Sequence, residues 1–141
     1  MADQKILLAF HRIDVLKDLS PQSQEILASF SALRTIRKNE TLFCESEPSP
    51  SCFGVLTGEV TLTPSPTSPA LKELGVYPVG KLLGGLSLLR DMPRPGRGSV
   101  TQSGELVSIW SSRFRSWVES QSSVAGEPPI LGELRRFLIL P

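Results

Sequence analysis

The chain has 141 residues, and its 15 basic and 14 acidic side chains give a formal net charge of +1. This length is enough for one hydrophobic core but not for two ordinary domains. The small net charge excludes a basic field that would concentrate nucleic acid or an anionic membrane, so any anion must be recognised locally.

The first 35 residues are expected to be helical. Apolar residues recur at helical spacing from Ile6 to Leu16, which predicts a first helix. Ser20 followed by Pro21 is a helix-start signal, and helical spacing then continues to Leu33. We therefore predict an N-terminal helical segment of two helices in residues 1–35.

Short segments of strand type follow in residues 36–111. They are residues 41–43 (TLF), 52–56 (CFGVL), 59–63 (EVTLT) and 106–110 (LVSIW). In residues 59–63 apolar and polar side chains alternate, which is typical of an antiparallel sheet with one face in water. The proline-rich residues 63–70 are expected to form a polar loop. These features predict a β-barrel or sandwich of short strands.

Residues 112–141 are predicted to return to helix. Phe114, Trp117 and Val118 stand at positions i, i+3 and i+4, the spacing of a helix with its apolar face on the barrel. The sequence SSVAGEPP predicts a loop, and a short helix is expected from about residue 132 to residue 140. Its apolar end at residues 137–140 either packs against the domain or docks on another surface.

The two cysteines and the lengths of the apolar segments indicate the cellular compartment. Cys44 and Cys52 lack the paired spacing of a zinc site. We expect them to be thiols of a reducing compartment, rather than a disulfide or a reactive thiol. No apolar stretch approaches the roughly 20 residues that cross a bilayer. The sequence therefore predicts a cytoplasmic protein with no membrane span in this segment and no bound metal.

Residues 80–100, GKLLGGLSLLRDMPRPGRGSV, have the composition of an anion site. The pair Gly84 and Gly85 precedes one apolar helical turn. Backbone N–H groups at the first turn of a helix lack acceptors, and glycine lets a ligand approach the main chain closely. An arginine folded over this turn supplies two parallel hydrogen bonds to phosphate oxygens. Arg97 is the candidate for that role, and Arg94 is the alternative cation in the same loop.

Five segments in this order resemble the cyclic nucleotide-binding domain family, over residues 14–118. They are residues 38–43 (KNETLF), 53–60 (FGVLTGEV), 80–89 (GKLLGGLSLL), 97–99 (RGS) and 107–110 (VSIW). The third segment is similar to the phosphate-binding cassette of the family, and the fourth to its arginine with two small neighbours. The resemblance implies a mainly β fold, an antiparallel jelly-roll β-barrel with N-terminal helices and a short C-terminal helix pair.

The resemblance also implies a ligand, cAMP or cGMP, whose phosphate binds the cassette at residues 80–100. The ligand-binding residues that it implies are Leu83, Gly84, Gly85, Leu86, Ser87, Arg97, Gly98 and Ser99. Phe137 and Leu138 are the candidate lid over the base. The single histidine, His11, has no neighbouring nucleophile or metal-ligand spacing, so we expect no enzyme, no catalytic residue and no cofactor.

Two departures from the family leave two hypotheses open. The cassette glutamate, which accepts the ribose 2′-hydroxyl in the family, falls on Gly85, and Pro128 and Pro129 break the chain where the long closing helix of the family would run. The first hypothesis is a sensor module that binds cyclic nucleotide through residues 84–87 and Arg97. The second is a degenerate domain that binds no nucleotide, has its pocket filled by its own side chains, and serves as a protein-interaction or regulatory domain of a larger protein.

Overall fold

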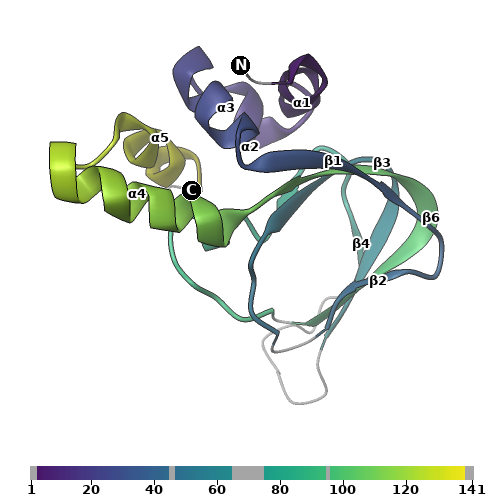
Figure 1. Ribbon diagram of the computed structural model, residues 1–141. Helices are drawn as coiled ribbons and strands as arrows, with labels where there is room; N and C mark the ends of the chain where they lie inside the picture. The colour runs from purple at the N-terminus through teal and green to yellow at the C-terminus, as the bar shows by residue number, and fades with distance from the viewer. Residues whose placement is uncertain (1–2, 45–46, 65–74, 95, 139–141) are drawn as a thin grey trace.

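The computed structural model describes residues 3–44, 47–64, 75–94 and 96–138. Within these ranges the chain forms α-helices, one short 3₁₀ helix (η1) and β-strands (Figure 1). In chain order they are α1 (Gln4–Phe10), α2 (Asp14–Lys17), α3 (Pro21–Ala28), β1 (Ser31–Ile36), β2 (Thr41–Phe43), β3 (Cys52–Pro64), β4 (Gly75–Tyr77), β5 (Leu82–Leu83), η1 (Gly85–Leu88), β6 (Gly96–Ile109), α4 (Ser111–Ala125) and α5 (Pro129–Leu138). Residues 65–70 of the predicted polar loop lie outside the described residues.

The strands form one antiparallel, jelly-roll-like sheet, as the sequence predicts. Its order is β1-β6-β3-β4, with β2 also paired to β6 and β5 to β3, so the hydrogen-bonded path is not closed. The long strands β3 and β6 pair from Cys52 opposite Ile109 to Pro64 opposite Gly96. The segments predicted at residues 52–56 and 59–63 are therefore two halves of β3. The register shifts between them, where Gly58 has a φ of +86°.

Two apolar clusters hold the fold together. The first packs the helices against the sheet and includes the fully buried Phe10 and Phe114. The second lies among the strands and includes Phe43 and Phe53, whose rings are parallel. The segment from β5 to η1 contributes Leu82 and Leu88 to the first cluster and Leu83 to the second. Core packing on both sides therefore positions this segment.

The N-terminal helices are shorter than the sequence predicts. The helix expected from Ile6 to Leu16 is divided into α1 and α2, where the backbone N–H of Asp14 donates to Gly80 O at 2.8 Å. The second helix ends at Ala28, and Leu33 lies in β1 opposite Val107. Pairing with β6 therefore overrides the helical spacing of these residues. The first strand begins at Ser31, ahead of the predicted boundary at residue 36.

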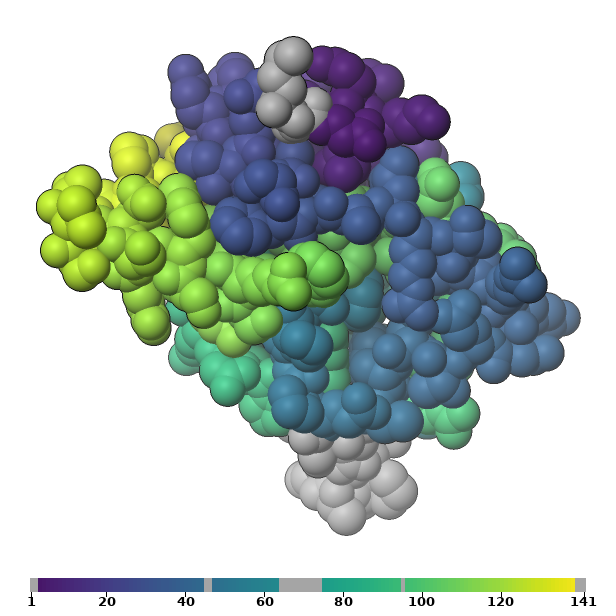
Figure 2. Space-filling view, viewed as in Figure 1, coloured from purple at the N-terminus to yellow at the C-terminus, as the bar shows by residue number. Residues whose placement is uncertain are grey.

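The C-terminal helices differ from their predicted bounds as well. Helix α4 continues to Ala125, so the sequence SSVA is helical and the turn is confined to residues 126–128, with Gly126 at a φ of +84°. Helix α5 begins at Pro129, since proline is well tolerated at the first helical position. Residues 139–141 lie outside the described residues. Figures 1 and 2 show α4 and α5 projecting from the body of the molecule beside the N-terminal helices.

Candidate functional site

The two glycines of the cassette form a tight turn between β5 and η1. Gly84 has a φ of +74°, a conformation that glycine adopts without strain. We call Gly84, Gly85, Leu86 and Ser87 the GGLS turn. The N–H of Ser87 donates to Gly84 O at 3.0 Å, whereas the N–H groups of Gly85 and Leu86 find no acceptor in the described part of the chain. These two N–H groups are the donors that a phosphate would use.

A cavity of about 210 Å³ lies against the GGLS turn. It is lined by Phe43, Ser49, Leu62, Leu83, Gly84, Gly85, Leu86, Ser87, Met92, Pro93 and Arg94. We call it the turn cavity. The structure thus brings together five of the sequence-predicted site residues, those at positions 83–87, and adds Arg94 as the cation at this cavity.

Arg94 is a buried cation that forms no ion pair within 4 Å among the described residues, although the carboxylate of Glu47 acts on it from farther away. Its side chain is 4% exposed, and its Nη2 donates to Ser51 O at 2.6 Å. Its Nη1 lies 3.0 Å from the point where a Cβ on Gly84 would stand, and its Nε has no partner. Burial lowers the pKa of Arg94, but a guanidinium stays charged at neutral pH. A buried charge without an ion pair is energetically costly, so binding of an anion beside Arg94 would be favourable.

The aromatic rings of β2 and β3 hold the guanidinium of Arg94. Its central carbon lies 4.5 Å from the centre of the Phe43 ring and 5.2 Å from that of Phe53. Gly98 makes room for this arrangement, because a Cβ at position 98 would lie 2.5 Å from a carbon of the Phe43 ring. Gly98 does not itself line the turn cavity; its lack of a side chain leaves the space that the Phe43 ring occupies.

Arg97 and Ser99 lie on β6 and do not line the turn cavity. Arg97 is exposed, stands opposite Thr63, and donates through Nη2 to the side chain of Thr41 at 2.9 Å. Ser99 pairs with Thr41 on one side and Thr61 on the other. The arginine that lines the turn cavity is therefore Arg94, the alternative cation, and Arg97 lies elsewhere on β6.

The hydroxyl of Ser87 is engaged within the protein. It donates to Ser111 Oγ at 2.8 Å, at the start of α4. The carbonyl of Ser87 accepts a hydrogen bond from Arg115, which also lies 3.7 Å from a carboxylate oxygen of Asp91. The GGLS turn is therefore tied to α4, so Ser87 offers a ligand its backbone N–H rather than its side chain.

Gly85 occupies the position of the family glutamate, and its surroundings are full. A Cβ at position 85 would lie 2.9 Å from Cδ2 of Leu82 and 3.0 Å from Cδ2 of Leu138. The predicted lid residues Phe137 and Leu138 pack against the first apolar cluster, and neither lines the turn cavity. The protein's own side chains thus fill the space next to position 85, while the turn cavity itself stays open.

The described residues show no other reactive centre. No group of three or more His, Cys, Asp and Glu side chains among them could hold a metal ion. Cys44 and Cys52 are both free thiols, and burial raises the pKa of Cys52 to about 12, which makes it a poor nucleophile. None of the described helices has the length and apolar character needed to cross a membrane.

The structure thus combines an antiparallel jelly-roll-like sheet with a glycine turn and a buried arginine that line one cavity. The model of the cyclic nucleotide-binding domain family matches residues 33–121, more than half of the chain. The chain belongs to this family. A search of curated proteins finds no match to it.

Solved structures share the fold. The N-terminal domain of a transcriptional regulator from Streptomyces coelicolor A3(2) is 22% identical, with a TM-score of 0.65 and coverage of 92% of this chain and 87% of that one. A cyclic nucleotide-binding-like protein from Brucella abortus is 18% identical, with a TM-score of 0.62 and coverage of 82% and 99%. The regulatory domain of Toxoplasma gondii PKA, crystallised with cAMP, is 15% identical, with a TM-score of 0.64 and coverage of 87% and 48%. The chain thus spans about half of that last protein.

Proposed function

We propose that this chain is a non-enzymatic sensor domain that binds the phosphate of a cyclic nucleotide at the GGLS turn, with Arg94 as its cation. The observation that carries the proposal is the buried guanidinium of Arg94, which forms no ion pair among the described residues and lines the same cavity as the GGLS turn. We expect the domain to act in the cytoplasm, with a protein partner or further domains as its output.

The geometry predicts weak binding. Gly85 offers no carboxylate to the ribose, and losing one charge-assisted hydrogen bond costs about 1.5 to 3 kcal/mol, or about ten- to a hundredfold in affinity. The turn cavity of about 210 Å³ is also smaller than the roughly 300 Å³ at which ligand pockets begin. The phosphate and ribose are therefore expected to enter the turn cavity, while the base stays at its opening.

The test is calorimetric titration with cAMP and cGMP of the wild type, Arg94→Lys and Arg97→Ala. Lysine keeps the charge but loses the planar fork of donors, so Arg94→Lys should weaken binding at least tenfold. Arg97→Ala is the matched control, because Arg97 is exposed and bound to Thr41, and it should leave the affinity unchanged. A thermal unfolding curve for each variant separates lost binding from lost folding.

A second candidate function is the degenerate interaction domain that binds no nucleotide. It is favoured by Leu82 and Leu138, which occupy the space beside position 85. No heat with either nucleotide up to millimolar concentration would support this second function and contradict the first. Loss of binding in Arg97→Ala but not in Arg94→Lys would keep the sensor function and overturn the role of Arg94.

A further inference from the structure

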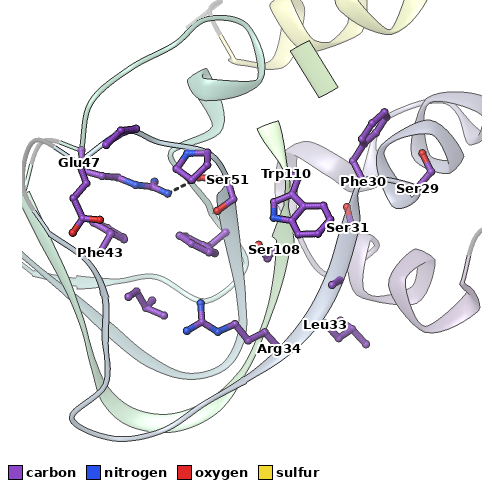
Figure 3. A pocket seen from close by; sticks show the side chains of 16 residues that line it. Ser29, Phe30, Ser31, Leu33, Arg34, Phe43, Glu47, Ser51, Ser108 and Trp110 are labelled. Atoms are coloured by element: carbon purple, nitrogen blue, oxygen red, sulfur yellow. Dashed lines mark hydrogen bonds between the residues drawn. The ribbon is translucent and has the colours of Figure 1, made fainter. Parts of the chain in front are cut away.

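A second and larger cavity shares Arg94 with the turn cavity. It has a volume of about 480 Å³ and is formed by β1, the segment between β2 and β3, and Trp110 at the start of α4 (Figure 3). We call it the aromatic cleft. No residue of the GGLS turn lines it, and Phe43 and Arg94 are the described residues common to both cavities. The aromatic cleft is thus a separate site that meets the turn cavity at two side chains, those of Phe43 and Arg94.

The walls of the aromatic cleft suit a flat ring. Phe43 and Phe53 line it with parallel rings, 6.2 Å between centres and 3° between planes. Trp110 lines it as well and is 50% exposed, with the guanidinium carbon of Arg113 4.0 Å from its ring centre (Figure 3). The ring of Phe30 points away from Trp110 and packs on Phe114 and Trp117. Aromatic side chains of this kind bind planar rings by offset or edge contacts. The size of the cleft is in the range of small-molecule sites.

The charges around the aromatic cleft favour an anion. Arg94 is buried there, with Nη2 on Ser51 O, which also lines the cleft, and with Nε unpartnered. Arg34 stands at the exposed rim, where it pairs with Glu40. The carboxylate of Glu47 lines the cleft, but it accepts from Cys44 N at 2.8 Å and forms no ion pair with Arg94 among the described residues. The one deeply buried charge is therefore positive.

We propose that the aromatic cleft binds a small aromatic carboxylate, with its ring against Phe43 and Trp110 and its carboxylate on Arg94. Compensation of the buried guanidinium supplies the preference for an acid over a neutral ring of the same shape. Burial of the ring against the aromatic walls supplies the rest of the affinity. Binding involves no covalent step, since the protein and the ligand keep their bonds and their protonation.

Because both cavities share Arg94, we expect a ligand in one cavity to weaken binding of a ligand in the other. This corollary rests on the proposed function. Nη1 is turned toward Gly84 and Nη2 toward Ser51, so a carboxylate in the cleft and a phosphate in the turn draw on the same guanidinium. Each ligand neutralises the charge that the other needs. By linkage, each must weaken the binding of the other by the same factor.

The binding step is tested by calorimetric titration of the full chain with 2-naphthoate, with 2-naphthalenemethanol as the neutral control. We expect saturable binding of the acid and at least tenfold weaker binding of the alcohol. Trp110→Ala, at a half-exposed position, should weaken binding of the acid at least threefold. Val124→Ala, on the far part of α4 and 88% exposed, should leave binding of the acid unchanged. Absence of acid binding up to millimolar concentration, equal binding of acid and alcohol, or no effect of Trp110→Ala would overturn the proposal.

The corollary is tested by repeating the cAMP titration in saturating 2-naphthoate. We expect the apparent dissociation constant of cAMP to rise at least threefold. Unchanged cAMP binding beside saturable naphthoate binding would overturn the sharing of Arg94. Naphthoate binding in a protein that gives no heat with cAMP would contradict the proposed function while it supports the aromatic cleft, so the two failures are distinguishable.

Discussion

At position 85 a glycine stands where the resemblance places the family glutamate, and the packing around it is tight, so that two leucine methyl groups would have to move to admit a Cβ. A Cβ at position 85 would lie 2.9 Å from Cδ2 of Leu82 and 3.0 Å from Cδ2 of Leu138. Leu138 belongs to α5, so the C-terminal helix packs directly beside the phosphate turn. A side chain at position 85 would therefore require the side chains of Leu82 and Leu138 to shift.

Replacement of Gly85 by alanine should lower the free energy of unfolding by about 1 to 3 kcal/mol, the usual cost of overpacking a core. Urea denaturation measures it. Gly132→Ala is the matched control, because a Cβ at that position in α5 meets nothing within 4 Å, and it should stabilise the protein by about 0.4 to 1 kcal/mol. An alanine at position 85 that is as stable as wild type would show that α5 does not press on the turn.

At the scale of elements, one carboxylate of α5 forms hydrogen bonds with the start of α3, in addition to the apolar packing of α5 on the N-terminal helices. Glu133 accepts hydrogen bonds from the backbone N–H of Ser20 at 2.6 Å, from its hydroxyl at 3.0 Å, and from the hydroxyl of Ser23. These groups cap the start of α3, so a side chain of α5 completes that cap. Burial alone would raise the pKa of Glu133, but the hydrogen bonds from Ser23 and Ser20 outweigh it and lower the pKa below its ordinary value.

A lowered pKa in the folded state gives a defined sign to the pH dependence. The contribution of Glu133 is fully present above its unfolded pKa, near 4.5, and is lost as the pH falls through the lower folded pKa. Glu133→Gln should cost about 1 kcal/mol at pH 7. The difference in unfolding free energy between wild type and this variant should shrink between pH 5 and pH 3. If the difference in unfolding free energy stays constant between pH 5 and pH 3, the ionised carboxylate of Glu133 does not stabilise the start of α3.

The elements also show where local pattern stops being informative. The signals that depend on neighbours in the chain were reliable: Ser20 and Pro21 start α3, and alternation marks the second half of β3. The helical spacing through Leu33 was misleading, because the choice between helix and strand at β1 is made by pairing with β6, more than seventy residues away along the chain. Periodicity carries no information about such a partner.

At the scale of the whole molecule, the order of five short segments was enough to predict the family and the jelly-roll-like sheet. The choice between Arg94 and Arg97 was not accessible in the same way. Which arginine lines the turn cavity depends on the path of the loop after η1. Tertiary contacts fix that path: Pro48 and Pro93 form an isolated β-bridge, and the backbone N–H of Arg94 donates to Glu47 O at 2.9 Å. Two arginines three residues apart look equivalent until that loop is placed.

A ligand that binds only the folded chain must raise the stability of the whole domain. At ten times its dissociation constant, cAMP should add about 1.4 kcal/mol, which corresponds to about 3 to 6 °C in Tm for a chain of this size. Differential scanning fluorimetry of the wild type with and without cAMP measures the shift. Arg97→Ala should show the same shift and Arg94→Lys a smaller one, whereas equal shifts in all three proteins would contradict a role for Arg94.

Phosphate binding at Arg94 can be followed directly by the NMR signals of the arginine side-chain Nε–H groups during a cAMP titration, assigned with Arg94→Lys and Arg97→Ala. Arg94 Nε is the buried side-chain atom without a partner among the described residues, so a phosphate at the GGLS turn must change its environment. We predict a saturable shift of the Arg94 signal with the Arg97 signal unmoved. A titration that moves Arg97 alone, or neither signal, would contradict the account.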